Sequence, residues 1–224
     1  MGLCQATCKR IELRISSKKM HNKLPRPILS ALRSGALEMK GEAQGPPVYT
    51  IGHSTRPTDE FVDLLEAADV TLVIDVRSIR GSRTNPQYNA EILPQSLAEF
   101  GIGYTPIPEL GGRRSRQRSV PPETNDYWQN RGFHNYADFA MSAEFEVGLR
   151  RLLTLSGDRT CAVMCAEAVW WRCHRRIIAD YLLLRGRVVL HLMEKGRVEP
   201  ASITPAALIR GKVLVYPSPA IGAP

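Results

Sequence analysis

Apolar residues gather from residue 48 onward in short runs, which alternate with stretches of helical periodicity. The runs are rich in β-branched side chains and have the length of buried strands. We predict five strands, at residues 48–51, 70–76, 101–107, 160–165 and 188–193. Residues 70–76 are almost continuously apolar, which is typical of a strand buried on both faces of a parallel sheet.

Apolar positions three and four apart predict helices between these strands, at residues 58–65, 92–100, 136–155 and 173–184. Strands that alternate with helices indicate the α/β class. We expect a single three-layer domain with a mostly parallel sheet of about five strands. The chain contains no internal repeat.

Composition divides the chain into three parts. Residues 1–47 mix Lys, Arg, Ser, Pro and Gly without periodicity, so we expect a flexible basic extension. Residues 48–216 are expected to form the α/β domain, and residues 217–224 a C-terminal tail. Residues 111–130 predict a long loop, and a loop of that length in a compact domain is either functional or mobile.

The net charge of +8 resides mostly in the extension. Residues 1–47 hold nine Lys and Arg against three Glu, a net of +6, which leaves +2 for the rest of the chain. A basic extension favours nucleic-acid binding only weakly, whereas a basic body would favour it strongly. The extension is therefore either a solvated tail or an arm that contacts an anionic partner.

Five cysteines in 224 residues are too few for a disulfide framework, and no uncharged apolar run approaches the ~20 residues that cross a bilayer. The N-terminus lacks the apolar core of a secretory signal. Met1-Gly2 begins like a myristoylation site, but Ala6 stands where Ser or Thr is needed. We expect a soluble, cytoplasmic protein with reduced thiols and no membrane partner.

Polar residues follow three of the predicted strands. Gly52-His53-Ser54 ends the first, Asp75-Val76-Arg77-Ser78 the second, and Cys165-Ala166-Glu167 the fourth. In open α/β sheets, ligands bind beyond the carboxyl ends of the strands. The sequence therefore predicts one polar site at this edge of the sheet.

Five motifs in order resemble the domain of unknown function 488 (DUF488) family. They are Thr50-Ile51-Gly52-His53-Ser54, Ile74-Asp75-Val76-Arg77-Ser78, Gly101-Ile102-Gly103-Tyr104, Leu110-Gly111-Gly112, and Met164-Cys165-Ala166-Glu167 with Cys173-His174-Arg175. The resemblance implies a compact α/β domain with a shared polar site, and no established reaction. The Ile-Asp-Val-Arg string also looks like a strand of rhodanese domains, but Cys165 is followed by Ala-Glu and a Trp pair where a rhodanese carries a loop of backbone amides.

The two cysteines of the last motif have several interpretations. Cys165, at a strand end facing a helix start with His174 and Arg175 nearby, is expected to favour the thiolate and to act as nucleophile or redox group. Its alternative is a buried structural cysteine. Cys173 is a resolving partner, a metal ligand or a packing residue. An eight-residue gap fits structural zinc spacing poorly, so we predict no metal and leave the cofactor open.

Carboxylates and arginines supply the other candidate roles. Asp75 is a candidate base or orienting group, and Arg77 an anion-binding group, unless the two form a structural pair. Glu167 is a candidate acid or base, because a partly apolar pocket beside Trp170 and Trp171 would raise its pKa. Six further arginines occupy two loops after strand ends: Arg80, Arg83, Arg113, Arg114, Arg116 and Arg118. Aromatic residues flank these loops, an arrangement that suits unpaired bases: Tyr88, Tyr127, Trp128 and Tyr136.

Three functional hypotheses follow, of which we favour an enzyme acting on a small anionic or nucleotide-like substrate. Its catalytic candidates are Cys165, Glu167 and Asp75. Its substrate-binding candidates are His53, Ser54, Arg77, Ser78, Arg83, Cys173, His174 and Arg175. The alternatives are a nucleic-acid-binding or base-processing protein, and a non-catalytic ligand-binding domain. The oligomeric state is left open.

Overall fold

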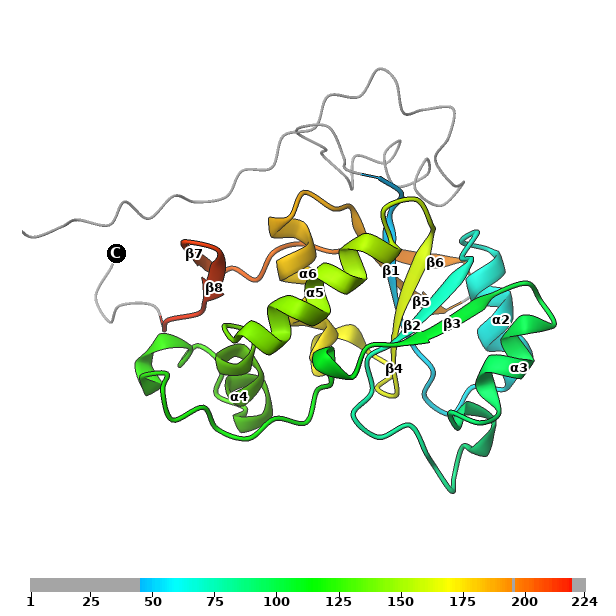
Figure 1. Cartoon of the computed structure of the whole chain (residues 1–224), viewed down its shortest axis with the longest axis horizontal. Helices are drawn as coiled ribbons and strands as arrows, with labels where there is room; N and C mark the ends of the chain where they lie inside the picture. Colours follow the sequence, from blue (N-terminus) through cyan, green and yellow to red (C-terminus); the bar gives the residue numbers. More distant parts are fainter. Residues whose placement is uncertain (1–44, 195, 219–224) are drawn as a thin grey trace, which may run out of the picture.

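The structure is a computed structural model and describes residues 45–194 and 196–218 (Figure 1). Most of the predicted basic extension, and the end of the predicted tail, lie outside the described residues. A mixed α/β domain follows, as the alternation of strands and helices predicted. In the described part of the chain no helix is long and apolar enough to cross a membrane.

The central sheet has six strands in the order β3-β2-β4-β1-β5-β6. Five are parallel and match the five predicted strands: β1 (Val48–Gly52), β2 (Leu72–Asp75), β3 (Gly103–Pro106), β4 (Cys161–Cys165) and β5 (Val189–Glu194). The antiparallel edge strand β6 (Arg197–Pro200) was not predicted. Two of its four residues are charged, one is proline and none is buried, so they carry no hydrophobic run that marks a strand.

A second sheet of two strands, β7 (Leu208–Arg210) and β8 (Val213–Val215), was also not predicted. Each strand has three residues, which is too short for a periodic signal. Figure 1 shows this hairpin at the far end of the molecule from α2 and α3.

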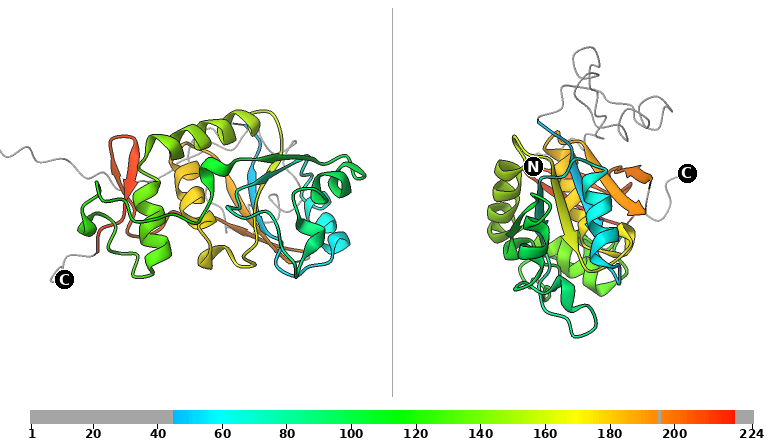
Figure 2. Two further views of the ribbon diagram at one scale, coloured as in Figure 1. Left: turned by 60° about the horizontal axis from the view of Figure 1, so that its bottom comes forward. Right: turned by 90° about the vertical axis from the view of Figure 1, so that its right-hand side faces the viewer.

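Helices cover both faces of the sheet (Figure 2). On one face, α2 (Thr58–Glu66) and α3 (Leu93–Ala98) enclose a core with Tyr49, Ile51 and Val73. On the other, α4 (Arg131–Phe139), α5 (Ala143–Leu155) and α6 (Arg175–Leu184) enclose a larger core. These two cores confirm the predicted three-layer arrangement.

The single helix predicted over residues 136–155 is wrong, because the structure divides it into α4 and α5. Ser142 has an extended ψ of 159°, and its hydroxyl accepts a hydrogen bond from the amide of Phe145. It is therefore the N-cap of a new helix. The apolar spacing continues across the break because both helices bury residues in the same core, so periodicity alone did not reveal it.

Asp180 ties the C-terminal segment to helix α6. Its carboxylate accepts hydrogen bonds from the amide of Thr204 at 2.8 Å and from the hydroxyl of Tyr216 at 3.1 Å. Burial raises the pKa of Asp180 from 3.8 to about 6, although these two hydrogen bonds oppose the rise. Folding thus disfavours the ionised form of Asp180 relative to the unfolded chain.

We predict that Asp180→Asn removes a pH-dependent part of the stability. Because the folded-state pKa is raised, the folded protein binds the proton more tightly, and stability from this group falls as pH rises from about 4 to about 6. The difference amounts to about 3 kcal/mol above that range. Urea unfolding of both proteins between pH 4 and 7.5 measures it. A constant difference between the two proteins across this range would contradict the prediction.

Candidate functional site

Asp75, at the end of β2, lies in a buried network of polar groups. Its side chain is fully buried, and Arg77 is 5% exposed. Asp75 Oδ2 accepts hydrogen bonds from Arg77 Nη2 at 2.7 Å and from the Tyr104 hydroxyl at 2.6 Å, and Arg77 Nε contacts Oδ1 at 3.0 Å. Arg77 Nη2 also donates to the carbonyl of Tyr88 at 2.8 Å. Most donors of Arg77 are therefore engaged within the protein.

His53 completes this network in a defined tautomer. Arg77 Nη1 lies 3.2 Å from His53 Nε2, and His53 Nδ1 lies 2.8 Å from the carbonyl of Ser54. Because arginine only donates and a carbonyl only accepts, Nδ1 carries the proton and Nε2 accepts. Burial lowers the pKa of His53 to about 4, with the positive charge of Arg77 adding to this effect. His53 is therefore neutral at physiological pH.

The alternation of side chains along the strands places Cys165 away from this network. Asp75 pairs in register with Met164, whose side chain packs in the core under α2 and α3. Cys165 follows Met164 and packs against the opposite core, with α4, α5 and α6. The predicted single polar site is thus two groups of residues on opposite faces of the sheet.

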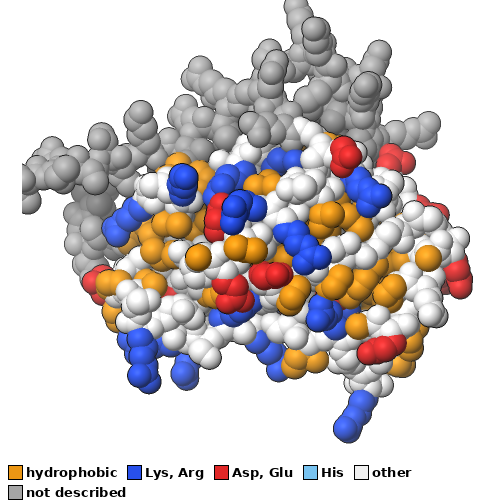
Figure 3. All heavy atoms as spheres, in the orientation of Figure 1, with side chains coloured by type: hydrophobic (Ala, Val, Ile, Leu, Met, Phe, Trp, Pro, Cys, Tyr) orange, Lys and Arg blue, Asp and Glu red, His pale blue; other side chains and the backbone are white. Residues whose placement is uncertain are grey.

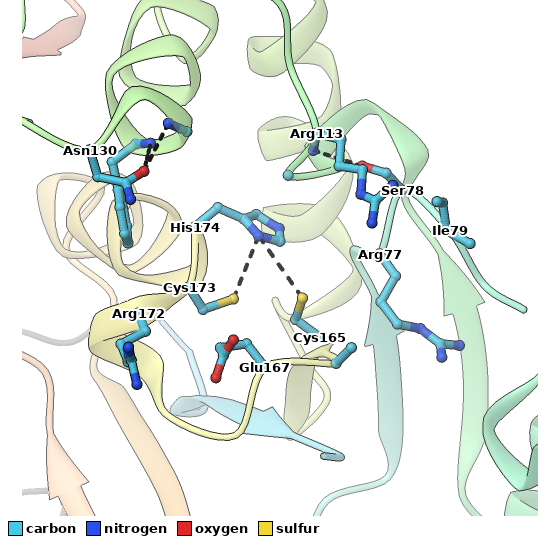
Figure 4. A pocket seen from close by; sticks show the side chains of 14 residues that line it. Arg77, Ser78, Ile79, Arg113, Asn130, Cys165, Glu167, Arg172, Cys173 and His174 are labelled. Carbon is cyan, nitrogen blue, oxygen red and sulfur yellow. Dashed lines mark hydrogen bonds between the residues drawn. The ribbon is translucent and has the colours of Figure 1, made fainter. Parts of the chain in front are cut away.

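Cys165, Cys173 and His174 form the second group, which we call the thiol–imidazole cluster (Figure 4). His174 Nδ1 lies 3.5 Å from Cys173 Sγ and 4.0 Å from Cys165 Sγ. The strand β4 supplies Cys165, and the turn before α6 supplies the other two. His174 Nε2 lies 3.2 Å from the carbonyl of Val76 and donates to it, so Nδ1 is the ring atom that faces the sulfurs.

The two thiols differ in acidity. Burial opposes ionisation of Cys173, but a hydrogen bond from Cys165, the positive charge of His174 when its ring is protonated, and Arg175 hold its pKa well below the usual value. Arg175 contributes directly, because its Nε donates to Cys173 Sγ at 3.3 Å. The pKa of Cys165 is raised by its hydrogen bond to Cys173 and by burial. The sequence favoured a thiolate at Cys165, whereas the contacts of Arg175 and His174 with the Cys173 sulfur favour it at Cys173.

Glycines allow backbone to approach this cluster closely. A Cβ atom added at Gly112 would lie 2.3 Å from His174 Nδ1, and one at Gly111 would lie 2.7 Å from the Ser78 hydroxyl. The hydroxyl of Tyr136 donates to the carbonyl of Leu110 at 2.8 Å and holds the same loop. The two glycines of the Leu110-Gly111-Gly112 motif thus let the backbone pack against Ser78 and His174, because neither has a side chain.

A cavity of about 450 Å³ opens over the cluster. Cys165, Cys173 and His174 line it together with exposed side chains, among them Arg113, Glu167 and Arg172 (Figure 4). A second hollow of about 450 Å³ lies beside it and shares Arg77, Arg113 and Glu167. The two together follow the carboxyl ends of the parallel strands, where the sequence predicted the site.

The predicted residues divide between these places. Ser78 and Glu167 line the first cavity, and His53, Ser54 and Glu167 line the second. Arg175 is buried and bonds Cys173 and the carbonyl of Glu167, so neither Arg175 nor Arg77 has a free guanidinium for an anion. Arg83 is exposed and lines neither cavity.

The tryptophans do not form a pocket for Glu167. Trp170 stacks on His191 with ring centroids 4.3 Å apart and donates to Glu199 at 3.0 Å, and Trp171 is exposed. Arg172, between them and Cys173, lines the cavity and was not singled out in the sequence. Because Arg172 directly precedes the Cys173-His174-Arg175 motif, the sequence could have marked it as a candidate site residue.

Comparison with protein families agrees with the motifs. The family described as Domain of unknown function DUF488 matches residues 57–182. The chain belongs to the DUF488 family. The matched residues include the Asp75–Arg77 pair, the Gly111-Gly112 loop and the thiol–imidazole cluster, whereas His53 and the motif that contains it precede the matched range.

No curated protein and no solved structure matches this DUF488 chain. The resemblance of its Ile-Asp-Val-Arg string to rhodanese domains is not addressed by these comparisons and stays a prediction.

We predict that Asp75→Asn destabilises the protein by about 3–5 kcal/mol, because it leaves the buried guanidinium of Arg77 without its counter-charge. Glu144→Gln is the matched control, since Glu144 pairs with Arg114 at the surface at 2.8 Å. Its loss should cost less than about 1 kcal/mol. Urea unfolding at pH 7 measures both changes. Equal effects of the two substitutions would contradict a stabilising role for the buried pair.

A methyl group at Gly112 is predicted to displace His174 from the two sulfurs. Gly112→Ala removes no reactive group, yet its Cβ would occupy the position of the His174 ring. We expect the imidazole resonances of His174 to shift in NMR spectra and the alkylation rate of Cys173 to change several-fold. Gly81→Ala is the control, because a Cβ there meets no atom within 4 Å. Unchanged His174 resonances in Gly112→Ala would refute this account of the motif.

Proposed function

We propose that this DUF488 protein is an enzyme that acts on a small anionic substrate, with its reaction centre at Cys165, Cys173 and His174. The observation that carries the proposal is the convergence of two sulfurs and an imidazole nitrogen on the floor of a cavity lined by arginines. Reactive groups at the base of a cavity, beside charged groups that orient a ligand, are the arrangement expected of an active site.

Arg113 and Arg172 are the anion-binding residues of the proposal. Both line the cavity and both are exposed, whereas Arg77 and Arg175 are engaged in the protein interior. The amide of Arg113 donates to the Ser78 hydroxyl at 2.9 Å, which fixes its backbone at the cavity edge. Planar guanidinium groups suit carboxylate and phosphate oxygens.

Glu167 is the proton-transfer group of the proposal. It is exposed at the cavity, and its backbone carbonyl accepts a hydrogen bond from Arg175, which ties it to the segment that carries Cys173. Asp75 and His53 are positioning residues. Both contact the guanidinium of Arg77, and Asp75 faces the opposite side of the sheet from Cys165.

A small substrate accounts for the surface better than a nucleic acid. Figure 3 shows Lys and Arg side chains scattered among acidic and apolar ones over the face that it draws. Phosphate-backbone binding relies on a continuous basic surface. The cavity volume of about 450 Å³ is in the range of small-molecule sites.

Protection of Cys173 from alkylation tests where the anion binds. Inorganic phosphate, or a small carboxylate, should slow the reaction of Cys173 with iodoacetamide in the native protein. Arg113→Ala and Arg172→Ala should each weaken this protection roughly tenfold, because each removes a charge-assisted contact. Arg118→Ala is the control, since Arg118 is exposed in the same loop and lines neither cavity.

Turnover distinguishes an enzyme from a binding domain. In a screen of phosphate and carboxylate esters, we expect hydrolysis by the wild-type protein and its loss in Cys173→Ser and His174→Asn. The Arg variants should chiefly raise KM. Anion protection without turnover of any ester would favour a ligand-binding domain. Protection that Arg113→Ala and Arg172→Ala leave intact would contradict the proposed substrate position.

A further inference from the structure

We propose that Cys165, Cys173 and His174 bind a thiophilic divalent cation, Zn²⁺, and that its fourth coordination position opens into the cavity. The inference deepens the proposed function, on which it rests for the anionic ligand that would reach the metal. The spacing of the three ligand atoms, the orientation of His174, the contact of Arg175 and the open cavity support the metal site.

The spacing of the three ligand atoms fits a tetrahedral metal. The sulfurs and His174 Nδ1 all lie within 4.8 Å of one another. Zinc bonds of about 2.3 Å to sulfur and 2.0–2.1 Å to nitrogen at tetrahedral angles separate sulfur from nitrogen by about 3.5 Å. The observed separations are 3.5 Å for Cys173 and 4.0 Å for Cys165. For the two sulfur–nitrogen pairs, binding therefore requires movements of a few tenths of an ångström.

The orientation of His174 is that of a metal ligand. Its Nε2 donates to the carbonyl of Val76 at 3.2 Å, so the lone pair of the neutral ring is on Nδ1 and faces the two sulfurs. Metal-binding histidines almost always donate their other ring nitrogen to a carbonyl or carboxylate in this way. The backbone of Gly112 packs against the ring and holds it there.

Arg175 supports the sulfur that carries the most charge. Its Nε donates to Cys173 Sγ at 3.3 Å, and it is 1% exposed. Hydrogen bonds from outside the ligand set orient thiolates and tune the bound metal. A cation of charge +2 would neutralise the two thiolates that binding requires.

Three ligands and an open cavity distinguish this site from a structural zinc site. Structural sites have four protein ligands, often in closely spaced Cys pairs, whereas catalytic sites have three and keep one position for water or substrate. The eight-residue gap that argued against a metal concerns the first kind. The described residues place no fourth Cys, His or carboxylate within the same range, and the cluster lines the cavity with Arg113, Glu167 and Arg172.

Zinc and cobalt titrations of the full-length protein test the site. Cys4 and Cys8 are also thiols, so Cys4→Ser/Cys8→Ser serves as the parent protein. We expect one Zn²⁺ per chain by competition with a chromophoric chelator. Substituted Co²⁺ should give thiolate-to-metal charge-transfer bands and the visible bands of four-coordination. Zn²⁺ should protect both Cys165 and Cys173 from alkylation, as measured by mass spectrometry.

Cys165→Ser, Cys173→Ser and His174→Ala should each weaken zinc binding by more than the roughly 10–100-fold that loss of a second-shell partner costs. Cys161→Ser and His134→Ala are the matched controls. Cys161 lies at the other end of β4, about 13 Å from Cys165. Far-UV circular dichroism of each variant shows whether it is folded, and the alkylation pattern of the parent tests the site without any variant in the cluster.

The outcomes separate this inference from the proposed function. Absence of charge-transfer bands, or zinc that leaves Cys165 and Cys173 reactive, overturns the metal site. So does formation of a Cys165–Cys173 disulfide under air in protein that was first reduced and then loaded with zinc. Anion protection in the metal-free protein would then still support the proposed function. Conversely, zinc bound by the three residues, with no effect of phosphate or of Arg113→Ala, would keep the metal site and reject the anionic substrate.

Discussion

The alternation of side chains along β2 and β4 is the constraint on which the rest of the site depends. The two strands are parallel neighbours in a fixed register, with Asp75 opposite Met164. Consecutive residues of a strand face opposite sides of the sheet, so Asp75 and Cys165 cannot share one face although both stand at strand ends. One face receives a buried network of carboxylate, guanidinium and neutral imidazole. The other receives two sulfurs and a second imidazole, and all three of these residues line the first cavity, which Arg77 alone of the buried network also reaches.

The division gives the two groups different physical tasks. Asp75 and Arg77 satisfy one another where water is excluded, and the partly exposed Tyr104 ties β3 to the end of β2 through its hydrogen bond to Asp75. A network of this kind stabilises only while every member is paired. The thiol–imidazole cluster, by contrast, has partners that leave Nδ1 and the sulfurs free to exchange protons or bind a ligand. Rigid structure on one face of the sheet thus holds reactive groups in place on the other.

The sequence predicted the strands, the α/β class and the edge of the sheet that carries the polar residues, because each depends on local pattern. It could not tell which polar residues meet. The sequence shows which residues alternate within β2 and within β4. It does not show how the two strands align, so it could not tell whether Asp75 and Cys165 face the same side of the sheet. Arg77 and Arg175 were expected to hold an anion because both belong to motifs at the predicted polar edge of the sheet, although a structural pair of Asp75 and Arg77 was the alternative. In the fold both are buried by other segments, and Arg113 and Arg172 occupy the cavity.

Cys173 and His174 show why spacing alone was a poor guide to the second group. Along the chain, Cys173 is eight residues from Cys165, farther than the close pairs of structural zinc sites. In space, the loop after β4 brings the start of α6 back beside Cys165. Arg175 holds this loop in place by donating hydrogen bonds to Cys173 Sγ and to the carbonyl of Glu167. Gly112 then closes the group from a third segment, because only a residue without a side chain fits against His174. Three segments build the cluster, one of them remote in sequence from the other two, and their convergence is a property of the fold.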